Sequence, residues 1–574
     1  MPLFINRSKN SLRSPGSGAS ARRAFTFLAL FIALYAICWP ALGAQDGRYD
    51  VVIYGGTTGG IFSAVSIARD GGGSVIVLEP TGHIGGMVTG GLGWTDLGTW
   101  RSIGGMAGEF YGRIKAHYDD PAAWKFETRD AYLKRPRRKP IADGKWWFHE
   151  PSAATRVLLE MMKEAGVTVL TNRRLVSVEK QGNRIVSIRS DKGDVFHGRV
   201  FIDATYEGDL LAKAGVSYRV GRESSAEYGE KFAGVVPREY STRKQWDVDI
   251  SPYAEDGTLL FGVQDIPRGK DGAGDRKVQA YNYRICLTDH PENRVPIEKP
   301  QNYDPRRYDL LARYIAAKPK IKLQRGLLGR FSALPNRKTD INDGGPFSTD
   351  FIGFNWDYPD GDSATRQDIL QQHLDYTRGL LYFIGHDPRV PGKIREEMLE
   401  WGYPKDEYTD NGNWTPQLYV REARRMVGDY VMTSHDLETN RSKEDSIGMG
   451  SYGADSHQVQ RIVENGVVRN EGNPNDFTPG HRPYEIPYRA ITPKRHESDN
   501  LLVTFCVSAS HMGFASIRME PVFMILSESA GLAAMDAVRQ DIAVQEVSYR
   551  RLLPKLMERE QLLKLEQLSG KTKH

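Results

Sequence analysis

Residues 55–60, Gly-Gly-Thr-Thr-Gly-Gly, have the types and spacing needed to hold a phosphate group. They stand between an apolar run, 49–54, and a segment with apolar residues at helical spacing, 61–70. Glycines let the backbone approach a ligand closely, and the amides at the start of a helix attract anions. Glu79 ends a second apolar run, 74–78, where a carboxylate can accept both hydroxyls of a ribose. The pattern predicts a β-α-β unit that binds a dinucleotide.

The glycine string departs from the usual G-x-G-x-x-G fingerprint at its middle position. Gly55 and Gly60 fill the first and last places, but Thr57 stands where a glycine normally lets the backbone reach the pyrophosphate. Gly56 can compensate by shifting the turn. By itself the string permits NAD, FAD or no ligand, and its glycines also suit simple packing of a helix on a strand.

Two later segments resemble the other nucleotide-binding motifs of two-domain flavoproteins. Residues 83–90, HIGGMVTG, carry a glycine doublet and a threonine at the place where backbone amides approach the FAD phosphates. Residues 201–215 resemble the later Ala-Thr-Gly element, with Tyr206 in place of the glycine. The cofactor predicted on this resemblance is FAD. The residues expected to bind it are Gly55, Gly56, Thr58, Gly60, Glu79, Gly85, Gly86, Thr89, Ala204, Thr205 and Glu520.

A more specific resemblance rests on stretches spread over most of the chain. They are YVREARRMVGDYV, DSIGMGSYGADSH, PYEIPYRAITP, NLLV and SASHMGFASIRMEPVFM. On these stretches the chain resembles an FAD-dependent oxidoreductase family similar to the flavin subunit of heterodisulfide reductase, in an exported bacterial form. Relatives with iron–sulfur clusters need cysteines, and this chain has only Cys38, Cys286 and Cys506. We therefore expect flavin chemistry without a cluster, no metal site, and buried thiols at the last two positions.

The expected fold is α/β: a Rossmann-like FAD-binding domain of the glutathione-reductase type with a mixed α+β substrate domain inserted. The predicted divisions are an export signal (1–44), the first part of the FAD-binding domain (45–215), the substrate domain (216–495), the return segment of the FAD-binding domain (496–540) and a C-terminal helical tail (541–574). Residues 151–166 predict a helix, with Pro near its start and Gly at its end. The glycine-rich ranges 271–275 and 448–453 lack a flanking strand and helix and are expected to be loops.

The resemblance to flavoproteins indicates how the reaction would run. With one nucleotide fingerprint, NAD(P)H is not expected as electron donor. Instead a small-molecule substrate would reduce the flavin by hydride transfer, and an external acceptor (oxygen, a quinone or a carrier) would reoxidise it. Oxidation needs a base near the flavin N5. His511, just before the predicted flavin-facing helix, is the first candidate and His457 the second; either can instead be structural. Arg518 is expected to position the flavin or substrate, or to form a buried ion pair with Glu520.

The substrate is predicted from aromatic and acidic residues that alternate in 351–362, FIGFNWDYPDGD. Aromatic faces with polar donors and acceptors suit sugars and polyols, so an alcohol of that class is the preferred substrate. The same aromatics can equally be ordinary core residues. A flavin-dependent amine oxidase or desaturase remains an alternative, as does a non-catalytic carbohydrate-binding protein on a degenerate flavin fold.

The first 44 residues read as an export signal. They contain five basic residues and no acid, an apolar run at 27–43, and a small-residue exit near Ala44. The pair Arg22-Arg23 resembles a twin-arginine signal, although an ordinary secretory signal fits equally. The whole chain has a net charge of +5, and this segment accounts for all of it. We therefore expect a periplasmic or secreted protein with no nucleic-acid partner and no stable membrane insertion once the signal is removed.

Overall fold

The central element is β1 (Asp46–Tyr54), in the middle of a sheet with the strand order β5-β2-β1-β8-β7-β6. The structure, a computed structural model, describes residues 46–136, 138–438, 441–474 and 482–569. β1 pairs in parallel with β2 (Val75–Leu78) and with β8 (Val195–Asp203), and its last four residues are buried. The fully apolar interior of these strands is typical of a parallel sheet covered on both faces.

The other strands of this sheet extend it on both sides of β1. β5 (Val169–Leu170) continues the parallel part beyond β2, and β21 (Leu501–Val503) returns from far along the chain to pair in parallel with the end of β8. β6 (Leu175–Gln181) and β7 (Arg184–Ser190) form an antiparallel hairpin beside the start of β8. The predicted α/β fold with a Rossmann-like parallel sheet is confirmed.

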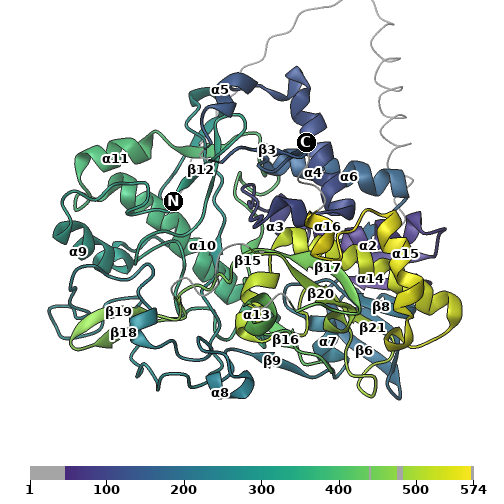
Figure 1. Ribbon diagram of the computed structural model, residues 1–574. Coiled ribbons are helices and arrows are strands. Elements are labelled where there is room, and N and C mark those ends of the chain that lie inside the picture. The colour runs from purple at the N-terminus through teal and green to yellow at the C-terminus, as the bar shows by residue number, and fades with distance from the viewer. Residues whose placement is uncertain (1–45, 137, 439–440, 475–481, 570–574) are drawn as a thin grey trace, which may run out of the picture. The chain divides into compact units, whose positions relative to one another are not determined.

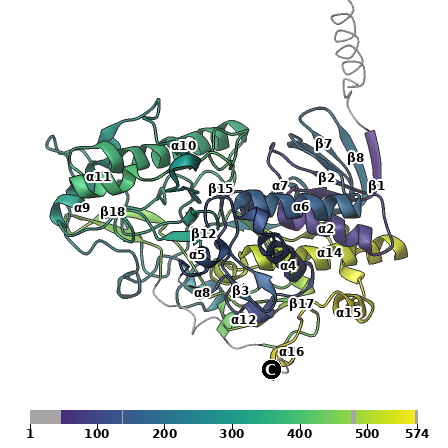
Figure 2. The same ribbon diagram turned by 90° about the horizontal axis from the view of Figure 1, so that it is seen from above.

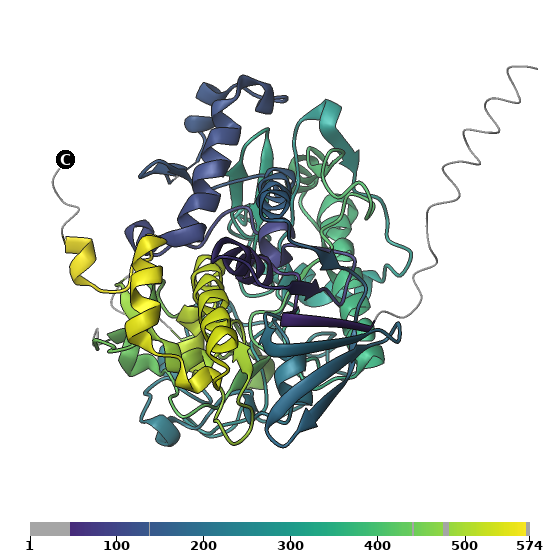
Figure 3. The same ribbon diagram turned by 90° about the vertical axis from the view of Figure 1, so that its right-hand side faces the viewer.

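Helices α2 (Thr58–Arg69) and α14 (Glu520–Gln540) pack against each other under the parallel strands (Figure 2). Small residues allow the close approach: Ser63 donates a hydrogen bond to the carbonyl of Ser527 at 2.7 Å, and a Cβ added to Gly531 would lie 2.6 Å from the Ser63 carbonyl. Figure 3 shows the yellow C-terminal helices beside the purple start of the chain. This packing brings residue 520 to the glycine string.

Local sequence signals explain two helix boundaries. The Thr57 side chain caps α2 by accepting from the Gly60 amide at 3.2 Å, so the threonine that breaks the fingerprint starts the helix. α6 (Pro151–Ala165) begins with proline and ends at Gly166, whose φ of 66° is left-handed, as the sequence predicts.

Residues 216–495, predicted to be an inserted substrate domain, contain helices, two-stranded sheets and irregular segments in the part that the structure describes (Figure 1). Its longer helices are α9 (Asp309–Ala317), α10 (Ser363–His386) and α11 (Gly392–Leu399). Its paired strands are β9 (Tyr218–Val220) with β16 (Arg424–Met426), β10 (Asn282–Tyr283) with β15 (Leu418–Tyr419), β11 (Arg294–Pro296) with β14 (Gly402–Pro404), β12 (Phe331–Leu334) with β13 (Lys338–Ile341), β17 (Ser446–Gly450) with β20 (Tyr484–Pro487), and β18 (Gln460–Glu464) with β19 (Val467–Glu471). The prediction of a loop at 448–453 is wrong in part, because β17 pairs with β20 there.

The remaining described elements flank the sheet or close the chain. They include α3 (Gly86–Thr89), α4 (Gly105–Asp119), α5 (Arg129–Leu133), α7 (Asp209–Lys213), α8 (Ser225–Tyr228), α12 (Ser434–Glu438), α13 (His511–Ile517), α15 (Tyr549–Glu558) and α16 (Glu566–Ser569), with β3 (Ile141–Ala142) and β4 (Lys145–Trp146). Cys286 and Cys506 are buried free thiols, as expected. Among the described residues, α14 alone is long and apolar enough to cross a membrane, and its apolar window is wholly buried in the protein. The predicted export signal lies outside the described residues.

Candidate functional site

The glycine string forms a tight turn between β1 and α2. Gly55 has a φ of 112°, and a Cβ added there would lie 2.6 Å from the carbonyl carbon of Ala204. A Cβ on Gly60 would lie 1.9 Å from the Gly55 carbonyl oxygen. These two positions therefore exclude any side chain.

The glycine doublet predicted from sequence lies directly beside this turn. The Gly85 amide donates to the Gly56 carbonyl at 2.7 Å, and Thr57 pairs with Gly85 as an isolated parallel bridge. Gly85 and Gly86 both have left-handed φ values, 92° and 54°. Thr89 closes the doublet's turn by donating to the Ile84 carbonyl at 2.6 Å. The structure thus brings the two predicted phosphate-binding segments together.

Glu79 lies at the end of β2, facing the turn. Its Oε2 accepts from the Gly56 amide at 2.7 Å, and its Oε1 accepts from the Thr81 amide at 2.8 Å. Burial raises the pKa of the Glu79 carboxyl to about 7. A cavity of about 600 Å³ opens here, which we call the dinucleotide cavity; it is lined by Gly55, Thr57, Glu79, Gly86, Thr205, Tyr206 and others.

The end of β8 forms the opposite wall of this cavity. The carbonyl of Ala204 accepts from the Thr57 hydroxyl at 2.9 Å, and Thr205 donates from its amide and hydroxyl to Asp203. Tyr206, which replaces the expected glycine, accepts from the Met87 amide at 2.9 Å and donates to Glu520 at 2.6 Å. Its phenol therefore joins α3 to the start of α14.

Glu520 lies at the first turn of α14 and close to the first turn of α2. Thr58 donates its hydroxyl to the carboxylate at 3.1 Å, and burial raises the pKa of Glu520 to about 7. The predicted alternative, an ion pair with Arg518, is not formed between these described residues. Arg518 donates instead to the Tyr419 hydroxyl at 2.8 Å and to the Asp455 carbonyl at 2.6 Å.

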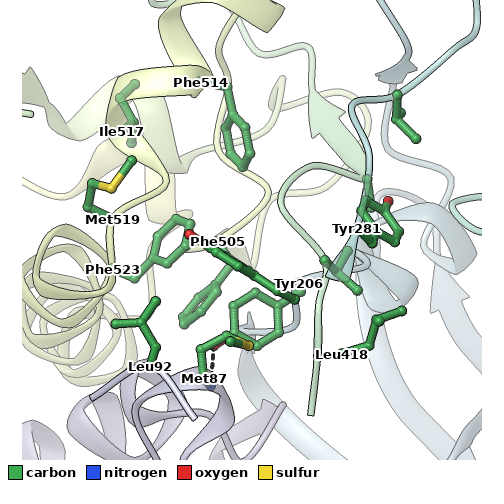
Figure 4. Packing of buried hydrophobic residues seen from close by; sticks show 14 of the residues in the cluster. Met87, Leu92, Tyr206, Tyr281, Leu418, Phe505, Phe514, Ile517, Met519 and Phe523 are labelled. Atoms are coloured by element: carbon green, nitrogen blue, oxygen red, sulfur yellow. Dashed lines mark hydrogen bonds between the residues drawn. The ribbon is translucent and has the colours of Figure 1, made fainter. Parts of the chain in front are cut away.

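A second space, the inner chamber, begins on the far side of Tyr206. It is lined by Tyr206, Tyr419, Val420, Arg421, Phe505, Phe514, Arg518 and Phe523. Figure 4 shows Tyr206, Phe505, Phe514 and Phe523 packed together with Met87 and Leu92. The chamber's volume is about 10 Å³, room for about one water molecule. Tyr206 is thus shared by the dinucleotide cavity and the inner chamber.

One comparison with known proteins identifies a family that matches most of the chain. Residues 50–556 match the family described as FAD dependent oxidoreductase. The chain belongs to that family. No curated protein matches the chain significantly.

Solved structures resemble only part of this FAD-dependent oxidoreductase. The L-amino acid deaminase from Proteus vulgaris is 17% identical, with 32% of this chain and 54% of that chain covered and a TM-score of 0.22. The 3-ketosteroid-delta4-(5alpha)-dehydrogenase from Rhodococcus jostii RHA1 is 16% identical, with coverages of 30% and 49% and a TM-score of 0.18. Thermovibrio ammonificans THI4 is 17% identical, with coverages of 38% and 81% and a TM-score of 0.22. The matched part spans about half the length of the first two.

The cofactor of this family is FAD, and the two cavities differ in how they fit it. The dinucleotide cavity suits the adenosine diphosphate half of FAD. Positions 55 and 60 of the turn exclude any side chain, the N-terminus of α2 points at the cavity, and Glu79 lines it. The inner chamber is too small for a flavin ring with its side chains as they stand. Seating the ring there requires the packed aromatic residues to move.

His511 starts α13 but does not line the inner chamber; Phe514, one turn later, does. Its Nδ1 lies 2.7 Å from Oε2 of Glu422, so the lone pair of a neutral ring is on Nε2. Burial, with a contribution from Arg425, lowers the pKa of His511 to about 3. The ring is therefore neutral near pH 7.

His457 lies among three aspartates, behind the chamber wall. Its Nδ1 lies 2.7 Å from Asp350 and 3.4 Å from Asp343, and its Nε2 lies 3.4 Å from Asp455. The pKa of His457 is raised, because the aspartates outweigh the opposing effects of burial and Arg421. A protonated ring is a poor base, so His457 fits a positioning role better than proton abstraction.

The group Asp343, Asp350 and His457 also has the side-chain types and spacing of a metal site, which the sequence spacing did not indicate. Its carboxylates already have cationic partners: Lys244 pairs with Asp343, and Arg421 pairs with Asp350 at 3.0 Å. The group is therefore accounted for as a buried ion-pair network.

Among the polar residues of the chamber, Arg518 was predicted as a site residue from the sequence, whereas Tyr206, Tyr419 and Arg421 were not. Tyr206 was visible only as a departure from a motif. The other two belong to the stretch YVREARRMVGDYV, whose cluster of charges in an apolar context was the available signal. Nothing in the spacing showed that the guanidinium groups of Arg421 and Arg518 both lie near the Tyr419 ring, 4.7 and 5.7 Å from its centroid.

The aromatic residues that suggested a sugar substrate lie mainly in the core. Phe351 is buried and stacks on Phe354 and Tyr376 at centroid distances of 3.8 and 4.2 Å. Tyr358 is buried and donates to Glu207. The ordinary core interpretation therefore describes Phe351, whereas Tyr358 is buried but also lines the dinucleotide cavity.

Proposed function

We propose that this FAD-dependent oxidoreductase oxidises a small polar substrate, preferably a sugar or polyol-type alcohol, at the inner chamber. The chamber as it stands has room for about one water molecule, so the aromatic residues that line it must move aside to admit the substrate. The single observation that supports the location is that Tyr206 borders both cavities, so a ligand that follows the dinucleotide cavity inward next meets Tyr419, Arg421 and Arg518. We further propose reoxidation by an external acceptor, which is oxygen, a quinone or a small carrier. With the aromatic platform buried, the preference for an alcohol rests on the polar side chains of the chamber.

Bound FAD supplies a two-electron acceptor for the hydride of the substrate C–H bond. The chain's part is to hold the adenosine diphosphate half at residues 55–60, 79, 85–86 and 204–205, and to orient the substrate. Arg518 donates to Tyr419, and that bond fixes the phenol that faces the chamber. The buried, mostly aromatic wall excludes water from the reacting atoms.

A base must take the proton that the substrate loses. We propose His511, because Glu422 holds its Nδ1, which leaves Nε2 to accept a proton; with a pKa of about 3 the buried ring is a weak base at rest. The Glu422 carboxylate would then stabilise the imidazolium that forms. His511 does not itself line the chamber, so proton transfer from a substrate there requires either a small shift of α13 or one relaying water.

The decisive experiment is spectroscopic. The purified protein, freed of its leader, should be yellow, and anaerobic addition of the right substrate from a panel of sugars, polyols and amines should bleach the flavin. A folded but colourless protein that cannot be reconstituted with FAD would refute the proposal. Bleaching by amines alone would favour the amine oxidase alternative. The absence of any flavin reduction across the panel, with FAD bound, would favour the non-catalytic alternative.

Export is also part of the proposal. Its support is the basic, acid-free start of the chain, the apolar run and the small residues near Ala44. Cell fractionation with N-terminal sequencing of the mature protein tests it, and replacing Arg22-Arg23 with Lys-Lys tests the twin-arginine route. The similarity to the flavin subunit of heterodisulfide reductase stays a proposal that rests on the five sequence stretches alone.

A further inference from the structure

We propose that Arg421 and Arg518 form a carboxylate-binding subsite in the inner chamber, so that the substrate is a small hydroxy acid such as an aldonic, uronic or 2-hydroxy acid. This inference rests on the proposed function, which places the substrate in that chamber. It deepens that function by stating which polar group of the substrate is recognised.

The first observation is that both guanidinium groups keep an unused donor. Arg421 and Arg518 are buried, with exposed fractions of 1% and 3%, and both line the chamber. Neither Nε–H has a hydrogen-bond partner among the described residues. Leaving a buried donor unpaired is destabilising, and native proteins rarely do so unless a ligand or a water molecule satisfies the donor.

The second observation is that the other donors of each arginine are engaged, which fixes the two side chains. Arg421 donates from Nη2 to Asn282 and Asn342, both at 3.0 Å, and pairs with Asp350. Arg518 donates to Tyr419 and Asp455. Both side chains line the chamber with their ends held, beside the Tyr419 ring.

The third observation is the charge of the surrounding network. Asp350, the partner of Arg421, and Asp455, a partner of Arg518, are joined by His457, which contacts both. Among the described residues, the ion pairs joined through His457 include the cations Arg243, Lys244, Arg421 and Arg518 and the acids Asp343, Asp350 and Asp455. This set has one positive charge in excess, which an anionic ligand would neutralise.

A carboxylate matches these donors better than a neutral hydroxyl does. Its two oxygens accept from two N–H groups at once, and bonds between charged partners are about twice as strong as neutral ones. The polar ring edge of a reduced, anionic flavin is a second possible source of such an oxygen. The flavin and the substrate must therefore be measured separately.

The test uses the FAD-loaded protein and titrates three matched pairs of probes: gluconate and glucitol, lactate and lactamide, acetate and acetamide. The change in flavin absorbance gives a Kd for each probe. Arg421→Lys and Arg518→Lys keep the charge beside Asp350 and Asp455 but remove the Nε–H. The matched control is Arg461→Lys, at a buried arginine outside the chamber whose Nε donates to Asn470.

We expect saturable binding of the acids by the unaltered protein and weak or no binding of their neutral partners. Each chamber variant should raise the Kd of the acids about tenfold or more, with little change for the neutral probes, and the control should change neither. Should a chamber variant not fold, Arg421→Gln with Asp350→Asn removes both charges of one pair together and is expected to show the same loss.

The outcomes separate this inference from the proposed function. Flavin bleaching by a neutral polyol, with no preference for acids, would overturn the carboxylate subsite and leave the proposed function standing. Acid binding that depends on both arginines, without any flavin reduction, would support the subsite and refute the proposed reaction. A change in FAD affinity or flavin potential in the variants, with an unchanged ratio of acid to neutral binding, would assign the arginines to the flavin and overturn the inference.

Discussion

Replacing Gly60 with alanine should damage both the fold and FAD binding, although alanine is the better helix former. The added Cβ would lie 1.9 Å from the Gly55 carbonyl oxygen and 3.3 Å from the Cβ of Ala204. Contacts under 3.0 Å are essentially never seen, so α2 and the end of β1 must separate by about 1 Å. Overpacking of this kind costs about 1–3 kcal/mol, more than the 0.5–1 kcal/mol that alanine contributes over glycine in a helix.

Gly112→Ala supplies the matched control. Gly112 also lies within a helix, α4, but nothing approaches its added Cβ within 4 Å. This variant should therefore gain about 0.5–1 kcal/mol of stability. Urea unfolding of the FAD-free proteins measures the difference, and titration with FAD under fluorescence measures affinity. Because the helix gain of alanine is common to both variants, we expect the Gly60 variant to be less stable than the control by about 1–3 kcal/mol and to bind FAD at least tenfold more weakly.

The close approach of strand and helix at Gly60 would be refuted by one clear result. If both alanine variants unfold at the same urea concentration and bind FAD equally well, the turn has room for a side chain. A loss of stability with unchanged FAD affinity would retain the packing argument but reject the role of this turn in holding the cofactor.

Three further predictions concern buried charge. Lys338→Met should cost about 3–5 kcal/mol in urea unfolding, because its wholly buried ammonium pairs with three carboxylates; adding Glu407→Gln should recover part of the loss. In the FAD-free protein the raised pKa of Glu520, about 7, means that the folded state binds the proton more tightly than the unfolded one. Stability should therefore fall as pH rises from about 4.5 to 7, by up to about 3 kcal/mol from this group, and Glu520→Gln should flatten that slope in unfolding measured across the range. His511→Ala should keep FAD but lose flavin reduction in anaerobic stopped-flow, whereas the buried His373, whose ring bonds a carbonyl of its own helix, should tolerate His373→Gln; unchanged reduction would remove His511 from the mechanism.

Much of the nucleotide-binding unit could be predicted from sequence because its signals are local. The apolar runs, the helical spacing after Thr58 and the acid at position 79 lie within about 30 residues, a length over which backbone geometry fixes what neighbours what. The prediction went wrong where strand pairing is not local: residues 446–450 become a strand only because β20 lies beside them. Thr57, an oddity in the motif, proves to be the helix cap.

The candidate site shows where tertiary structure decided. Residue types alone left open an ion pair between Arg518 and Glu520, two positions apart. In the structure Glu520 accepts a hydrogen bond from Thr58, 462 residues away in the sequence, and Arg518 donates to Tyr419. Packing also divided two buried aromatic residues, because Phe351 stacks on Phe354 and Tyr376 while Tyr419 lines the chamber. By itself the sequence determined a dinucleotide-binding unit and its FAD-type motifs, since those depend on short-range backbone geometry. Which charged groups meet, and which remain with an unused donor, depends on packing between distant segments, and only the folded chain decides it.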